Sequence, residues 1–431
     1  MSVPRTEAMP RDRIRVFQRK LYRAAKQCVP YRFGILYDKV IRQDVLAEAW
    51  RRVARNDGCA GVDGQSVKGI EGQYGVERFL QELQQELKEE RYAAAVIRRV
   101  YIPKGDGRER PLGIPTVKDR VVQMAVKIVI EPLFEADFLD CSYGFRPQRS
   151  NQQAVEEVHR AINTRKWVVD IDLKSYFDTI PHDKLLNCVR QRVSDRRVLH
   201  LIRCWLKAGI MEEGAVRQPD SGTPQGGVLS PLLSNIYLHE LDQRMRKDVG
   251  KLIRYADDLV VLCHTQEQAQ ASLEKIKHNL SELGLAVNEV KTRIGHVSEG
   301  FDFLGFTYRE AYSRRQKRKV RVKYPRTKSL KAIRARIKET IRRVPLGEEF
   351  GEVIASVNRQ LRGWANYFRI GNSSVAALEL SAYVGEQLRI WWRRRKQRKR
   401  VRGLGAWGNG FFYRHGLVSL PALVRGGANA V

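Results

Sequence analysis

The sequence predicts an α+β fold in which a split βαβ-like sheet precedes a helical domain. Between residues 167 and 284 the pattern reads strand, helix, strand, Asp-Asp turn, strand, helix. From Thr327 onward the apolar residues recur at helical spacing in three successive stretches, which indicates a small helical domain. The length of 431 residues suffices for two or three domains.

The chain is strongly basic. Its 79 Lys and Arg residues outnumber its 48 Asp and Glu residues, which leaves a formal net charge of +31. A charge of this size indicates a polyanionic partner and says nothing about the fold. Because 43% of the residues are hydrophobic, we expect a globular protein and not a disordered basic tail.

Cysteine spacing and hydropathy indicate which kinds of protein this chain is not. The 6 cysteines are scattered, with no Cys-x-x-Cys pair, which argues against zinc and against a disulfide framework and favours reduced thiols inside a cell. No run of apolar residues is long enough to predict a membrane span, and the N-terminus lacks the apolar core of a signal peptide. The oligomeric state is left open.

The N-terminal residues 1–60 are expected to form a basic extension. Residues 11–27 predict a basic helix, which is either an RNA-contacting arm or an exposed helix face. The glycine-rich stretch 56–64 predicts a tightly turned loop, which fits either a phosphate backbone or a plain connector.

A hairpin is predicted where residues 98–104 and 108–115 flank an Asp-Gly turn. Lys104 and Arg110 lie on its two arms, where they either clamp a triphosphate or belong to a solvated charged hairpin. The strongly apolar stretch 119–134 then predicts a buried helix.

A loop at residues 142–150 mixes aromatic and guanidinium groups. Stacking and phosphate contacts at single strands are the usual chemistry of such loops. Arg146 and Arg149 are therefore candidate nucleic-acid contacts.

Carboxylates end one predicted strand and join two others. Asp170 and Asp172 share one face of the alternating strand 167–173. Asp257 and Asp258 lie at a turn between two apolar runs. Neighbouring carboxylates repel each other unless a hard cation such as Mg²⁺ binds them, and a solvated Asx turn is the alternative.

Helices are predicted around these strands. Pro181 is expected in the first turn of one helix. The glycine-rich stretch 222–231 leads into another, and its glycines would let a substrate backbone approach closely. Thr265 and Gln268 predict a capping box for a third helix, which ends at Gly284.

Asp172, Asp257 and Asp258 together suffice for a two-metal site. One ion would lower the pKa of a primer 3′-hydroxyl and the other would steady a triphosphate and the leaving pyrophosphate. The residues therefore predict a nucleotidyl transferase that acts on nucleic acid.

The C-terminal helices carry cations around their apolar stripes, among them Arg334 and Lys338. A nearly continuous cationic run follows, and so dense a run is expected to meet phosphates. Its basic residues are Arg393, Arg394, Arg395, Lys396, Arg398, Lys399 and Arg400.

Six ordered blocks around Tyr255-Ala256-Asp257-Asp258 resemble the reverse transcriptases and splicing maturases encoded by bacterial group II introns. The blocks are residues 110–115, 142–147, 172–178, 224–231, 284–292 and 303–306, and residues 361–368 resemble the thumb or maturase domain of that family. The resemblance implies a right-hand polymerase fold, with fingers and palm containing an antiparallel sheet, followed by an α-helical thumb. We expect fingers and palm at residues 61–312, the thumb at 313–390 and a basic DNA-binding segment at 391–431.

The resemblance also implies roles for individual residues. Asp172, Asp257 and Asp258 match the ligands of two Mg²⁺ ions, whereas Asp170 is expected to lie too deep to ligate. Phe177 matches a bulky gate that would clash with a ribose 2′-hydroxyl. The remaining matches are nucleotide contacts, namely Lys104, Arg110, Gln225 and Lys291.

The resemblance implies intron RNA, a DNA target and primer, and dNTPs as partners, in a bacterial cytoplasmic, nucleoid-associated setting without a membrane. Since no Cys follows Cys263, we expect no C-terminal endonuclease, and pre-existing 3′ ends would then serve as primers. Two alternatives stay open. One is a reverse transcriptase of this lineage recruited to defence or repair, and the other is a non-catalytic RNA-binding splicing factor.

Overall fold

In the computed structural model, the described residues are 10–28, 31–103, 109–212, 215–217, 221–223, 226–248, 250–314, 316–395 and 408–426, with the side chains of 10–12 and 215 left out. They fall into two compact units. Unit 1 comprises Met1–Ser150, Ile171–Leu259 and Gln270–Arg293. Unit 2 comprises Asn151–Asp170, Val260–Ala269 and Ile294–Val431. The division expected from the sequence, at residues 60, 312 and 390, stays a prediction.

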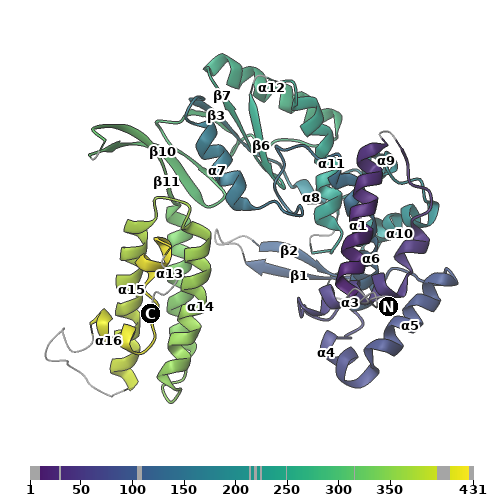
Figure 1. Cartoon of the computed structure of the whole chain (residues 1–431), viewed down its shortest axis with the longest axis horizontal. Helices are drawn as coiled ribbons and strands as arrows, with labels where there is room; N and C mark the ends of the chain where they lie inside the picture. Colours follow the sequence, from purple (N-terminus) through teal and green to yellow (C-terminus); the bar gives the residue numbers. More distant parts are fainter. Residues whose placement is uncertain are drawn as a thin grey trace, which may run out of the picture. The chain divides into compact units, whose positions relative to one another are not determined.

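The centre of the N-terminal part of unit 1 is helix α6 (Val117–Glu135), which is buried over most of its length. Thr116 caps it by accepting a hydrogen bond from Asp119 N at 3.0 Å. Helix α1 (Pro10–Gln27) packs along α6, and Gln18 Nε2 donates to Ile128 O at 3.0 Å (Figure 1). The predicted buried helix is confirmed. The basic N-terminal helix buries Ile14 and Ala25, whereas its described cations, Arg13, Arg15, Arg19, Lys20, Arg23 and Lys26, are exposed.

Five shorter helical elements complete this part of unit 1. They are α2 (Tyr37–Val40), α3 (Gln43–Ala54), α4 (Val67–Gly69), the π-helix η1 (Ile70–Tyr74) and α5 (Val76–Lys88). Helix α3 packs on both α1 and α6.

The predicted hairpin is present as β1 (Ile97–Pro103) paired antiparallel with β2 (Glu109–Ile114). Two further strands, β4 (Ile210–Glu212) and β5 (Ala215–Arg217), extend it into a sheet of order β2-β1-β4-β5. Strand β4 runs parallel to β1 and antiparallel to β5. The sequence pattern did not indicate this addition.

The second four-stranded sheet has the order β6-β7-β3-β8. Its strands are β3 (Trp167–Asp172), β6 (Lys251–Tyr255), β7 (Asp258–Cys263) and β8 (Arg293–His296). The interleaved helices are α8 (Tyr176–Thr179), α9 (His182–Arg190), α10 (Arg196–Lys207), α11 (Ser230–Met245) and α12 (Gln266–Glu282). The sequence predicts Pro181 in the first turn of α9. In the structure it is the N-cap residue, one position before that turn.

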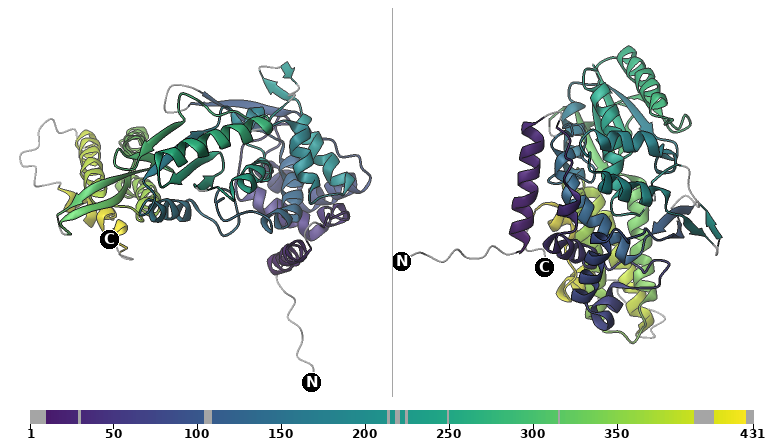
Figure 2. Two further views of the ribbon diagram at one scale, coloured as in Figure 1. Left: turned by 90° about the horizontal axis from the view of Figure 1, so that it is seen from above. Right: turned by 90° about the vertical axis from the view of Figure 1, so that its right-hand side faces the viewer.

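Unit 2 contains a three-stranded sheet of order β11-β10-β9. Strands β10 (Phe306–Ser313) and β11 (Arg318–Pro325) form a long antiparallel ribbon (Figures 1 and 2), and β9 (Phe301–Phe303) pairs with β10. Helix α7 (Asn151–Ala161) is tied to this sheet, because Tyr308 donates to Val155 O at 3.3 Å and Lys323 pairs with Glu156.

The helical domain predicted from Thr327 onward is confirmed. Helices α13 (Thr327–Arg343), α14 (Phe350–Phe368) and α15 (Ser374–Arg395) lie side by side, followed by α16 (Asn409–Arg414) and α17 (Leu420–Val424) (Figure 1). Ile337, Leu361 and Leu388 are buried between them. The α+β class, with antiparallel pairs and a helical C-terminal region, is therefore as predicted. Among the described helices, none is long and apolar enough to cross a membrane.

His239 on α11 is expected to make the stability of unit 1 sensitive to acid. Its ring packs edge-on against Phe138 with centroids 5.5 Å apart, and burial lowers the pKa of His239 below its usual value. Since a free imidazole titrates near about 6.5, the unfolded chain binds more protons below that pH, and the free energy of unfolding falls as pH falls. We expect His239→Phe to weaken this dependence by up to ~1.4 kcal/mol per pH unit.

The measurement is urea unfolding of both proteins between about pH 7 and about pH 5. His264 is exposed, so His264→Phe should leave the pH dependence of the wild type unchanged. An identical pH dependence for wild type and His239→Phe would rule out this role for His239.

Candidate functional site

The paired carboxylates lie at the turn between β6 and β7 (Figure 1). Ala256 adopts a left-handed backbone conformation with φ +56°, which directs the chain sharply into Asp257. Asp258 begins β7 and is exposed, whereas Asp257 is half-buried. Because β3 is the neighbour of β7 in the sheet, Asp172 at the end of β3 belongs to the same region of the protein.

The charges of these residues act on one another. The pKa of Asp257 is raised above its usual value, mainly by burial and further by the negative charge of Asp172. The cations Arg110 on β2 and Arg254 on β6 act in the opposite direction. Two of the three predicted carboxylates and the hairpin residue Arg110 are therefore close enough to affect one another electrostatically.

Lys291 forms an ion pair with Asp172. Its Nζ lies 3.1 Å from both Oδ1 and Oδ2. The loop that carries Lys291 is fixed to the end of β3, because Asn288 N donates to Asp172 O at 2.7 Å. The predicted nucleotide contact Lys291 is thus placed directly beside a predicted metal ligand.

A fully buried guanidinium, that of Arg254, stabilises the carboxylate turn. Arg254 donates to Asp242 through Nε at 2.9 Å and also through Nη2, and both side chains are inaccessible to solvent. Nη1 of Arg254 donates to Asn235 Oδ1 at 2.9 Å and to Ala256 O at 3.1 Å. This arginine therefore connects helix α11 to the turn that presents Asp257.

The segment before Arg146 lies against the same turn. Tyr143 N donates to Arg254 O at 2.9 Å, and Asn235 Nδ2 donates to Gly144 O at 2.7 Å. A Cβ on Gly144 would lie 2.4 Å from Ala256 N, so only glycine allows this close approach. The backbone of residues 143–144 thus also packs against the turn that presents Asp257.

Phe177 follows Asp172 on the short helix α8, and its side chain is half-buried. Its carbonyl oxygen accepts a hydrogen bond from Thr223 N at 2.7 Å. A Cβ on Gly222 would lie 2.8 Å from that oxygen, so residues 222–223 pack tightly on the segment that carries Phe177. These contacts fix the backbone of Phe177, the residue predicted to act as the gate.

Several of the predicted contact residues lie outside the described part of the chain. These are Lys104, Gln225, Lys396, Arg398, Lys399 and Arg400.

Two of the predicted nucleic-acid contacts are instead engaged within the protein. Arg146 is buried, forms a forked pair with Glu135 at 2.8–3.0 Å and donates to Ser142 O at 2.8 Å. Arg149 pairs with Asp140 and lies over the Tyr143 ring. The geometry of Arg146 indicates a structural role, because its donors are already satisfied and it has little contact with solvent.

The predicted contacts on the C-terminal helices are more accessible. Lys338 on α13 and Arg393 and Arg394 at the end of α15 are exposed. Arg334 pairs with Glu379 at 3.2 Å, and Arg395 lies over the Trp391 ring.

Within the described residues, no three His, Cys, Asp or Glu side chains are arranged to hold a metal ion. The carboxylates nevertheless suit Mg²⁺, which takes only one or two protein carboxylates and completes its shell with water and substrate phosphates. Burial is the main cause of the raised pKa of Asp257, and the charge of Asp172 adds to it; a bound cation would relieve that repulsion.

No structural or catalytic role for Arg254, Asp242 or Asn235 was predicted from the sequence. A signal was present, since a cation within an apolar strand must find a carboxylate when the strand is buried. The partner could not be chosen from the sequence, because Asp242 lies on a separate helix.

Two family models match the sequence of the chain. The family described as "Reverse transcriptase (RNA-dependent DNA polymerase)" matches residues 102–308, and "Group II intron, maturase-specific domain" matches residues 330–407. Protein YkfC of Escherichia coli (strain K12) is 39% identical over 330 residues, which cover 67% of this chain and 86% of that protein.

The group II intron-encoded protein LtrA of Lactococcus lactis subsp. cremoris is 29% identical over 446 residues, which cover 82% of this chain and 73% of that protein. Among solved structures, a chain of the partial Cas6-RT-Cas1--Cas2 complex matches with a TM-score of 0.36 and 25% identity, over 57% of this chain and 41% of that one.

Arg254→Met is expected to lower the free energy of unfolding by about 3–5 kcal/mol, because it leaves the carboxylate of Asp242 buried and uncompensated. The double variant Arg254→Met, Asp242→Leu should recover much of that loss. The exposed pair Arg197–Asp38, at 3.1 Å, provides the matched control, and Arg197→Met should cost less than about 1 kcal/mol. Urea unfolding measures all four proteins, and equal losses for the two single variants would contradict the assigned role.

Proposed function

The chain belongs to the reverse transcriptases encoded by group II introns, a family of RNA-directed DNA polymerases, and we propose that Asp172, Asp257 and Asp258 carry its nucleotidyl transfer. The observation that supports this assignment most is electrostatic. Asp172 lies near enough to Asp257 to raise its pKa, although the two residues come from different strands of the sheet. A polymerase of this kind needs position and charge from the protein and little covalent chemistry.

We also propose that the three carboxylates hold two Mg²⁺ ions. Bound there, the ions would supply Lewis-acid chemistry that lowers the pKa of the primer 3′-hydroxyl and offsets charge on the leaving pyrophosphate. Lys291 would exchange its contact with Asp172 for the phosphates of the nucleotide, since an ammonium group pairs with either anion. Arg110, together with Lys104 and Gln225, would hold the triphosphate and the base of the incoming dNTP.

The C-terminal helices are proposed to bind the intron RNA and to promote its splicing and mobility. The maturase-specific match at residues 330–407 supports this role, as does the cationic surface that includes Lys338, Arg393 and Arg394. On this proposal the protein copies intron RNA in the bacterial cytoplasm, beside the nucleoid DNA that provides its target and primer.

Asp257→Asn is expected to abolish DNA synthesis without unfolding the protein. The substitution keeps the shape of the side chain and removes the charge that metal binding requires, so extension should fall by about a thousandfold. The measurement is primer extension on an RNA template with dNTPs and Mg²⁺. Asp183 on α9 is exposed, and Asp183→Asn should extend like the wild type.

No extension by a folded wild-type protein that still binds RNA would refute the polymerase assignment and favour a non-catalytic splicing factor. Full activity of Asp257→Asn would refute the assignment of the metal ligands alone.

Phe177→Ala should relax the preference for dNTPs over rNTPs. Removal of the ring removes the clash with the ribose 2′-hydroxyl, and the ratio of kcat/KM values for dNTP and rNTP should fall by roughly ten- to a hundredfold. Single-nucleotide incorporation measures this ratio. Tyr312→Ala removes an aromatic ring that is 64% exposed on the β10–β11 ribbon and should leave the ratio unchanged. A ratio that Phe177→Ala does not alter would exclude the gate.

A further inference from the structure

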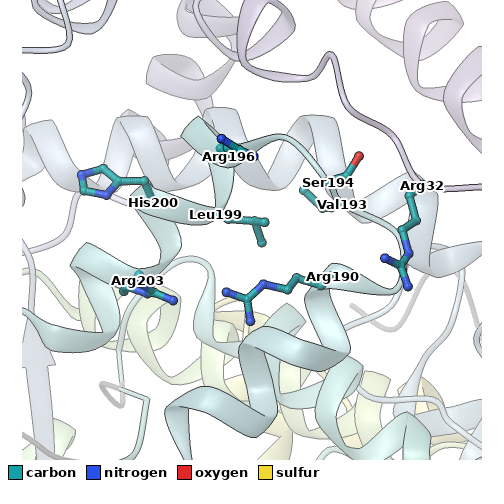
Figure 3. Close-up of a pocket in the computed structure, with 8 residues that line it drawn as sticks. All are labelled: Arg32, Arg190, Val193, Ser194, Arg196, Leu199, His200 and Arg203. Atoms are coloured by element: carbon teal, nitrogen blue, oxygen red, sulfur yellow. The ribbon is translucent and has the colours of Figure 1, made fainter.

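Outside the carboxylate site, unit 1 contains a cavity of about 430 Å³ lined by arginines (Figure 3). Its cationic lining comes from Arg32, from Arg190 at the end of α9, and from Arg196 and Arg203 on α10. We refer to these four arginines and the space between them as the arginine pocket. No predicted site residue lines it.

The backbone builds this pocket from segments far apart in the sequence. Arg196 and Arg203 are seven residues apart on α10 and therefore face the same side of the helix. Asp195 caps α10 and also accepts hydrogen bonds from Leu36 N and Tyr37 N, both at 2.8 Å. A parallel bridge between Phe33 and Val193 fixes the adjacent chain, so Arg32 is held against the start of α10.

The guanidinium groups of the pocket are not neutralised. Among the described residues, none of the four arginines has an ion pair with a carboxylate, and Arg190 donates only to the neutral Asn187 at 2.8 Å. Neighbouring arginines differ, since Arg192 is paired with Asp137 and Arg197 with Asp38. Four like charges that share a concave site repel one another, and an anion bound between them would relieve that repulsion.

An exposed aromatic residue, Tyr31, precedes the pocket residue Arg32 in the chain. Tyr31, next to Arg32 in the chain, is 56% exposed, and its ring contacts Phe33 edge-on with centroids 4.9 Å apart. An exposed ring one residue from a pocket arginine suits an unstacked base and the phosphates that flank it. Duplex DNA offers phosphates but no unstacked base, so the combination favours RNA with single-stranded segments.

We propose that the arginine pocket binds the phosphodiester backbone of RNA, with Tyr31 stacking on an unpaired base, at a site separate from the carboxylate turn. The proposal rests on the proposed function in one respect, because it takes the polyanionic partner to be the RNA on which the enzyme acts. Forked guanidinium groups bind phosphate through paired hydrogen bonds, and the cavity is large enough for a nucleotide-sized group.

The test is RNA binding by Arg196→Ala, Arg203→Ala across a salt titration, with an RNA hairpin that carries a single-stranded tail as the probe. Loss of two phosphate contacts should reduce the slope of log K against log salt by about 1.4, and affinity should fall roughly tenfold or more. Tyr31→Ala should weaken binding about tenfold without a change in slope, because stacking releases no counterions.

The matched control is Arg246→Ala, Lys247→Ala, which removes the same charge from exposed positions outside the pocket. An equal loss in control and pocket variants would overturn the proposal, as would a loss confined to duplex DNA of the same length. Thermal unfolding of each variant confirms that the comparison is between folded proteins.

Primer extension on a short annealed template separates this proposal from the proposed function. The pocket variant should retain the kcat of the wild type, since none of its substitutions lies at the carboxylate turn. If the wild type fails to extend the primer and the pocket variant still loses RNA affinity, the polymerase assignment fails and the arginine pocket stands.

Discussion

A guanidinium without access to water determines where the carboxylate turn lies. Arg254 must find acceptors inside the protein, and it does so by joining Asp242 and Asn235 of α11 to the carbonyl of Ala256. Buried ion pairs add little net stability compared with apolar packing, but they enforce one arrangement, because any other leaves a charge unpaired. The position of Asp257 thus depends on a helix that contributes no carboxylate of its own to the chemistry.

The cations of this basic chain fall into two groups, those with a carboxylate partner and those without one among the described residues. Arg146 and Arg192 are buried and have carboxylate partners, so they stabilise loops and are not available to a ligand. The exposed members of the arginine pocket, such as Arg196 and Arg203, have no such partners among the described residues. A net charge of +31 therefore indicates a polyanionic partner, but only the pairing of individual side chains indicates where that partner binds.

Charges of both signs act on the carboxylate turn. Asp172 raises the pKa of Asp257, Arg110 and Arg254 lower it, and Lys291 pairs with Asp172 itself. Asp172 thus already binds one cation, and the ammonium group of Lys291 can pair with either a carboxylate or a phosphate. That property suits a site in which nucleotide and pyrophosphate arrive and leave with their charges.

The sequence by itself determined the features that depend on local pattern. The β1–β2 hairpin, the strand that ends at Asp172, the turn at Asp257 and the helices from Thr327 onward all follow from apolar periodicity and turn residues within a few positions. The capping box at α12 was likewise readable, since Gln268 N donates to Thr265 Oγ1 at 3.3 Å. These features need no knowledge of distant contacts.

Only the tertiary structure decided which charged side chains meet. Helix α10 was not foreseen, although Asp195 caps it and apolar residues recur along it. Its cations, together with Arg32, form a pocket because the chain before α2 returns to the start of this helix. The sequence likewise favoured Arg146 as a nucleic-acid contact and assigned no role to Arg254. Partner choice for a charge depends on which groups lose water together, and packing between distant segments sets that loss.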